Sequence, residues 1–97
     1  DLEVFTVNLD EDGHYLQVGL TVKIRETPVA AEIKKQMPEI RNRILMVLSS
    51  KKPAQISNTV GKQQLSQEIL NEIKQSLSSE EFQEDVLDVL FTSFVIQ

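Results

Sequence analysis

The chain has 97 residues, of which 40% are hydrophobic and 26% are charged, and its formal net charge is −5 at pH 7. This length and composition predict one globular domain, with enough apolar side chains for one sheet and one helical layer. The negative charge argues against nucleic acid as a partner, because phosphate binding needs a basic surface, and the absence of cysteine excludes disulfides and thiolate metal sites.

Two strands joined by a tight turn are predicted at the start of the chain. Apolar residues alternate with polar ones over residues 5–9 and again over residues 16–24, which is the pattern of a strand with one buried face. Residues 10–14 supply the turn, because Gly13 adopts positive φ at no steric cost and aspartates bond nearby amides. We therefore expect a hairpin whose two apolar faces lie on one side.

After residue 25 the apolar period changes to that of a helix. Thr27 and Pro28 form a helix start, with the hydroxyl as the expected cap and proline in the first turn. The apolar stripe that follows comprises Val29, Ile33, Met37, Ile40, Ile44, Val47 and Leu48. Pro38 removes one backbone hydrogen bond, so we expect either a kink near Gln36 or two helical segments in sequence.

A second amphipathic helix is predicted over residues 59–77, with Thr59 as its cap. Residues 49–53 separate the two helical regions, and residues 54–57 allow at most one further turn. The apolar stripe of this second helix comprises Leu65, Ile69, Leu70, Ile73 and Leu77. Residues 78–85 follow as a polar, acidic connection, which Phe82 is expected to anchor to the core.

The chain ends in an apolar segment, residues 86–96, with the character of a strand. Strict alternation places Leu90, Phe94 and Ile96 on one face and Leu87, Val89, Phe91 and Val95 on the other. Such a strand is either central in a sheet covered on both sides or has one face buried against another subunit. The predicted fold class is α+β, with a small three-stranded sheet, the hairpin plus the C-terminal strand, packed against two main helices.

Candidate catalytic and metal-binding groups are few. His14, the only histidine, follows Asp10 and Asp12, which suggests a metal ligand or a general base. In a solvated turn, however, one imidazole without a partner activates nothing. The start of an EF-hand calcium loop is matched by Asn8, Asp10, Asp12 and Gly13. The twelfth position of that loop is Gly19 instead of the bidentate glutamate, so a hairpin turn is the better interpretation.

Five carboxylates follow the second predicted helix: Glu80, Glu81, Glu84, Asp85 and Asp88. Paired carboxylates serve a hydrolase or a hard cation only inside a shaped pocket, so a solvated acidic surface is the favoured interpretation. The sequence also lacks a Gly-x-Ser-x-Gly element and a Gly-rich phosphate loop. We therefore predict no enzyme activity, no catalytic residues, no cofactor and no metal.

A charged surface of the first helical region is the candidate for contact with a partner protein. Charges of mixed sign recur there at spacings of three and four residues, which is also the pattern of a solvated helix face. The candidate contact residues are Glu32, Lys35, Glu39, Arg41 and Arg43.

Short segments spread along most of the chain form one recognisable pattern. They are residues 5–9 (FTVNL), 15–18 (YLQV), 37–45 (MPEIRNRIL), 48–51 (LSSK), Gly61-Lys62 with Leu65, and 91–97 (FTSFVIQ). Together with its spacings, this pattern resembles the C-terminal domain of the FliL family of flagellar basal-body proteins. Leu90 stands where that family more often has tyrosine.

The resemblance implies that residues 1–97 are a single periplasmic domain of an inner-membrane protein at the flagellar basal body, with an N-terminal transmembrane anchor expected to precede them. It implies a fold of the stomatin/prohibitin (SPFH) class, which assembles into rings. It also implies association with the stator units of the flagellar motor, which supports stator assembly or torque in swimming and swarming. The implied partners are further copies of the chain, stator proteins and, through the anchor, the inner membrane.

Two other functions stay open on the residues alone. The first is a periplasmic module that binds a small ligand or a metal through the acidic segment or the turn at residues 8–14. The second, ranked last, is a hydrolase, for which the sequence suggests no substrate.

Overall fold

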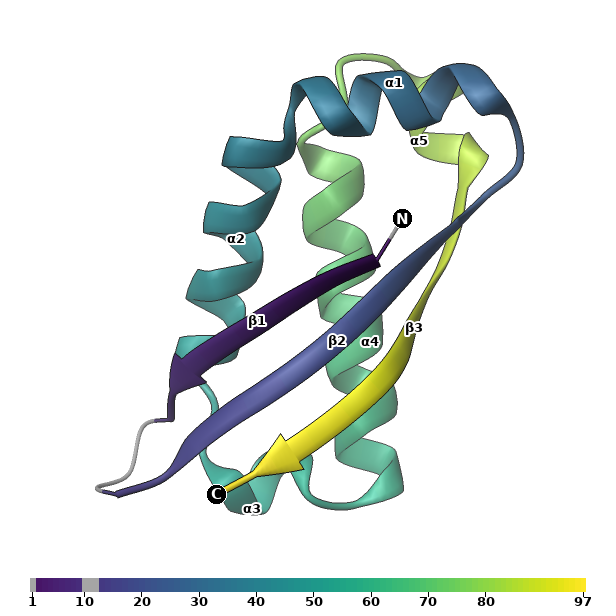
Figure 1. Ribbon diagram of the computed structural model, residues 1–97. Helices are drawn as coiled ribbons and strands as arrows, with labels where there is room; N and C mark the ends of the chain where they lie inside the picture. The colour runs from purple at the N-terminus through teal and green to yellow at the C-terminus, as the bar shows by residue number, and fades with distance from the viewer. Residues whose placement is uncertain (1, 10–12) are drawn as a thin grey trace.

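A three-stranded antiparallel sheet forms one layer of the structure, and helices packed on one of its faces form the other (Figure 1). The computed structural model describes residues 2–9 and 13–97. The strands are β1 (Leu2–Asn8), β2 (Tyr15–Ile24) and β3 (Val86–Ile96), in the order β1-β2-β3. The helices are α1 (Thr27–Lys35), α2 (Met37–Ser49), α3 (Pro53–Ile56), α4 (Thr59–Gln75) and α5 (Glu80–Asp85). The predicted α+β class is confirmed.

The predicted hairpin is confirmed as well. β1 pairs with β2 in antiparallel register, with Phe5 opposite Val18 and Val7 opposite Leu16, and all four side chains are buried. Gly13 has a φ of 80°, which glycine adopts without strain. The rest of the predicted turn, residues 10–12, lies outside the described residues. The apolar faces of the two strands therefore lie on one side, toward the helices.

Of the two alternatives for the last strand, the central position in the sheet is wrong, because β3 lies at an edge (Figure 1). Two register shifts against β2 leave Thr92 and Leu87 as extra residues on β3. Each shift reverses which positions face inward, so the two faces predicted from strict alternation are wrong. The residues paired with the inward-facing row of β2 are Val86, Val89, Phe91, Phe94 and Ile96.

Three apolar side chains of β3 are nevertheless exposed. Leu87 is 39% exposed, Leu90 48% and Val95 42%. The bulges thus explain why most apolar residues of β3 are inward-facing although they occur at both odd and even positions, but they do not account for these three. Burial of these remaining side chains against another subunit stays a prediction.

Of the two outcomes expected at Pro38, a kink or two helical segments, the structure has two helices. α1 ends at Lys35 and α2 begins at Met37, because proline is compatible with a first turn and incompatible with a helix interior. The predicted apolar stripe faces the core, with only Met37 and Val47 partly exposed. The expected cap at Thr27 is wrong: Glu26 occupies the cap position of α1 and makes no side-chain cap bond.

The apolar stripe predicted for the second helix is buried, but α4 ends at Gln75, before Leu77, and its predicted cap is one residue off. Asn58 has extended backbone angles, and its Oδ1 accepts a hydrogen bond from the Gly61 N–H at 2.7 Å. α3 is the single additional turn that was expected. The acidic connection is itself a short helix, α5, because the Ser79 Oγ accepts the Phe82 N–H at 3.1 Å and acidic residues favour a first turn. Phe82 packs against the core, as predicted.

The two candidate caps of α4 make a paired prediction. Replacing Asn58 with alanine is expected to lower the free energy of unfolding by about 1 kcal/mol, because the Gly61 N–H loses its acceptor. The adjacent Thr59→Ala variant is the control and is expected to change stability by less than about 0.5 kcal/mol. Urea unfolding measures both values. An equal loss of stability in the two variants would show that Asn58 is not the cap.

Candidate functional site

The structure gives three of the five predicted contact residues different surroundings. Glu32 accepts a hydrogen bond from the Ser78 Oγ at 3.4 Å, beside α4. Lys35 is exposed in the last turn of α1. The Arg41 guanidinium lies 4.7 Å from the centre of the Phe5 ring, against β1. These three residues therefore have different neighbours, and whether any of them contacts a partner stays a prediction.

Glu39 and Arg43 are the pair that the fold does bring together. The Arg43 Nε lies 3.4 Å from Glu39 Oε2, and its Nη1 donates to Glu72 Oε1 at 3.0 Å. The same Nη1 also donates to Gln75 Oε1 at 3.3 Å. The hydrogen bond to Glu72 raises the pKa of the Arg43 guanidinium above its ordinary value, so this side chain stays protonated at neutral pH. Arg43 thus links α2 to α4 within the chain.

The carboxylates considered for catalysis or metal binding are spread over α5 and β3. Asp85 lies 3.9 Å from the Arg25 guanidinium, and Asp88 Oδ1 accepts its neighbour's N–H, that of Val89, at 2.8 Å. His14 is at the opposite end of β2 from α5 (Figure 1). Among residues 2–9 and 13–97, no group of three or more histidine, cysteine or acidic side chains is arranged to hold a metal ion.

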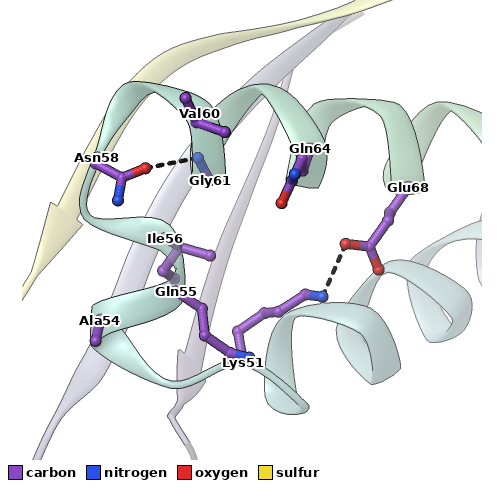
Figure 2. Close-up of a pocket in the computed structure, with 9 residues that line it drawn as sticks. All are labelled: Lys51, Ala54, Gln55, Ile56, Asn58, Val60, Gly61, Gln64 and Glu68. Carbon is purple, nitrogen blue, oxygen red and sulfur yellow. Dashed lines mark hydrogen bonds and ion pairs between the residues drawn. The ribbon is translucent and has the colours of Figure 1, made fainter.

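A polar hollow between α3, α4 and the segment that follows α2 was not predicted (Figure 2). It encloses about 310 Å³ and is lined by Lys51, Ala54, Gln55, Ile56, Asn58, Val60, Gly61, Gln64 and Glu68. Figure 2 shows Lys51 reaching across the hollow to Glu68, and the Nζ–Oε1 distance is 2.8 Å. The Lys51 side chain is 19% exposed and that of Glu68 is 46% exposed. The Lys51 ammonium is thus already paired with the Glu68 carboxylate, and Glu68 is the more exposed of the two side chains.

Gly61 makes this hollow possible by allowing a close approach of two helices. A Cβ at this position would lie 2.9 Å from the Gln55 carbonyl carbon and 3.2 Å from the Ile56 Cα. Only glycine therefore lets α3 pack against the first turn of α4. The hollow left no clear signal in the sequence, because its lining residues come together only when α3 packs on α4.

In the part of the chain that the structure describes, no helix has both the length and the apolar character needed to cross a membrane.

Comparison with known proteins gives one consistent result. The family model described as "Flagellar basal body-associated protein FliL" matches residues 1–97. A relative named "Flagellar protein FliL" from Escherichia coli (strain K12) is 30% identical over 96 residues, which cover 99% of this chain and 62% of the relative. Another of that name from Aquifex aeolicus (strain VF5) is 36% identical over 95 residues, which cover 96% of this chain and 56% of the relative. The chain thus spans less than two thirds of the length of these relatives.

Proposed function

Because the chain belongs to the FliL family of flagellar basal body-associated proteins, we propose that it is a non-enzymatic periplasmic domain that assembles with further copies of itself and associates with the stator units of the flagellar motor. The observation that carries this proposal is the family match over residues 1–97. In this role the domain supports stator assembly or torque during swimming and swarming. An N-terminal anchor in the inner membrane holds the domain beside the motor.

The distribution of exposed apolar side chains supports a role in protein contact. Met46 on α2 is 67% exposed and Val60 on α4 is 62% exposed, in addition to the three exposed apolar side chains of β3. Val4 on β1, the other edge strand, is 53% exposed as well. Single exposed apolar residues are common, but here they occur on both edge strands of the sheet and on two helices. An edge strand also presents backbone groups that a second chain can pair with.

The placement of titratable groups supports the absence of catalysis in this proposal. A serine hydrolase needs its histidine within hydrogen-bond reach of a carboxylate and a nucleophile. His14 lies at the hairpin end of the sheet, whereas α5 and its carboxylates lie at the other end (Figure 1). The carboxylates of α5 are therefore not the partners of His14.

Motility tests the proposed contact face on α1. In a flagellated bacterium whose own full-length gene is deleted, the gene carrying Lys35→Glu is expected to restore swarming less well than the wild type. A reversed charge at a contact weakens binding by roughly tenfold, or about 1.4 kcal/mol. The matched control is the neighbouring Lys34→Glu, which makes the same charge change one residue away. Equal swarming in both strains would show that Lys35 is not a contact residue.

The ligand-binding alternative has a separate test. Calcium, zinc and a chelator are each expected to leave the unfolding temperature of the domain unchanged. A ligand that binds only the native state would add about 2.7 kcal/mol of stability when present at 100 times its Kd. Differential scanning calorimetry measures the transition, and a rise of several degrees with either metal would favour the alternative over the scaffold.

A further inference from the structure

The two edges of the sheet differ in how their backbone groups are used. β1 and β3 are the edge strands, and each has one side without a neighbouring strand (Figure 1). An edge strand directs every second N–H and C=O away from the sheet, and another polypeptide can pair with these groups. Proteins prevent such pairing by covering or distorting the edge.

The outer edge of β3 is closed. The Val89 C=O accepts a hydrogen bond from the Ser66 Oγ of α4 at 2.8 Å, and the Val89 N–H donates to Asp88 Oδ1 at 2.8 Å. The two register shifts of β3 distort this edge further, because a bulge twists a strand and interrupts its regular spacing. Farther along, the Lys62 Nζ of α4 lies 4.9 Å from the centre of the Phe94 ring. A further strand therefore meets no regular edge on β3.

The outer edge of β1 is regular and open. Tyr15 exchanges both of its backbone hydrogen bonds with the last residue of the chain, at 2.7 and 2.9 Å, so its backbone groups point toward β3. Directions alternate along an antiparallel strand, so the next residue, Leu16, and its β1 partner Val7 point toward each other. The same alternation directs the N–H and C=O of Thr6 and Val4 away from β2, and no register shift interrupts the pairing of β1. Within residues 2–9 and 13–97, no turn, loop or side chain pairs with these outward groups.

The helix beside this edge supplies an apolar side chain. Arg41 and Leu45 are four residues apart, so they share one side of α2. The Arg41 guanidinium lies 4.7 Å from the centre of the Phe5 ring, which shows that this side faces β1, whereas Arg43 faces Glu72 on α4. Leu45 is only partly buried against the core. The inner side of an added strand would therefore lie against Leu45.

We propose that the outer edge of β1 binds an extended segment of another protein, which adds to the sheet as a fourth strand. Pairing with the outward backbone groups of Val4 and Thr6 holds the segment in place. The segment has apolar side chains at every second position, because those on its inner side cover Leu45. Its other side extends the surface of Val4, which is 53% exposed. The inference rests on the protein contact in the proposed function and specifies one surface for it.

A second copy of the chain is a poorer fit to this edge. In the described part of the chain, β2 is paired on both sides and the outer edge of β3 is closed. A second copy therefore has only its own β1 to offer. Pairing of two identical edges is isologous and stops at a dimer, so it does not build the assembly of further copies proposed above.

Photocrosslinking in living cells tests the proposal, with a photoreactive amino acid at Val4, at Thr6 or at Gln17 of the full-length protein. Directly opposed residues of paired strands have Cβ atoms about 4.5–5.5 Å apart. Val4 and Thr6 are therefore expected to capture two residues of one partner segment that lie two positions apart in its sequence. Gln17 lies opposite Thr6 on the central strand, away from the edge, and is expected to capture that segment in lower yield.

Two variants at Thr6 give the matched comparison. Thr6→Pro deletes an N–H that points away from β2, a position at which an edge strand tolerates proline, whereas Thr6→Ala keeps that N–H. With the photoreactive residue at Val4, Thr6→Pro is expected to lower the capture of the segment by about fivefold or more, the effect of one lost hydrogen bond. Thr6→Ala is expected to leave the capture unchanged. Urea unfolding verifies that both variants are folded, and the spacing of two positions tests the contact without either variant.

Three results would overturn the proposal: no capture at Val4 and Thr6, equal capture at Gln17, or an equal loss in the two Thr6 variants. Capture of residues 2–8 of a second copy would contradict it as well, because the chain itself would then occupy the edge. If the edge positions capture nothing while positions on α1, α4 or α5 capture further copies and stator subunits, the edge contact is wrong and the proposed function stands.

Discussion

Replacing Leu48 with alanine is expected to lower the free energy of unfolding by about 3 kcal/mol. Leu48 is fully buried in the last turns of α2 and belongs to the core between the helices and the sheet. Truncation removes apolar contacts and leaves a cavity, because a packed interior relaxes only in part. This loss is a large fraction of the stability of a typical domain, which is about 5–15 kcal/mol.

The control for this prediction lies two residues away. Met46 is on the same helix but is 67% exposed, so Met46→Ala is expected to change stability by less than about 0.5 kcal/mol. Urea denaturation of both variants gives the two free energies directly. A large loss at Met46, or a negligible one at Leu48, would mean that α2 presents a different face to the sheet.

Replacing Gly61 with alanine is expected to lower the free energy of unfolding by about 2 kcal/mol. At most helix positions the same change stabilises a protein, by up to about 1 kcal/mol. Here the added Cβ would overlap the backbone of α3 at Gln55, and backbone atoms move less easily than the end of a side chain. The expected sign is therefore opposite to that of the helix propensity.

Val60→Ala is the matched control, because Val60 is adjacent and 62% exposed. It is expected to leave the unfolding midpoint nearly unchanged. If Gly61→Ala instead raised the midpoint in urea, α3 would have to pack farther from α4 than the structure places it. The hollow between Lys51 and Glu68 would then also have a different shape.

The parts of the fold that the sequence predicts correctly depend on local periodicity. The alternation over residues 16–24 identifies the buried face of β2, and the stripes of α2 and α4 identify theirs, because each pattern repeats within a few residues. Pro38 marks the boundary between α1 and α2 for an equally local reason, the loss of one N–H.

The errors concern features that depend on a partner segment. The extra residues Thr92 and Leu87 are defined only by the register against β2, which strict alternation within β3 does not contain. The edge position of β3 also depends on strand order. Asn58 and Thr59 are both good cap residues, so the sequence does not distinguish them. The extended backbone angles of Asn58 make it the cap.

The candidate sites show the same division. Helical spacing correctly suggests that Glu39 and Arg43 are neighbours, but the contact of Arg43 with Glu72 joins residues 29 apart in the sequence. Lys51, in the segment between α2 and α3, and Glu68 on α4 are likewise brought together only by the fold.

The most direct test of the proposed function is photocrosslinking of the full-length protein in living cells at its normal expression level. A photoreactive amino acid is placed at exposed positions on α1, α4 and α5, and the crosslinked partners are identified by mass spectrometry. The proposal predicts crosslinks to further copies of the chain and to stator subunits. Recovery of neither, with the protein present and folded, would contradict a scaffold beside the flagellar motor.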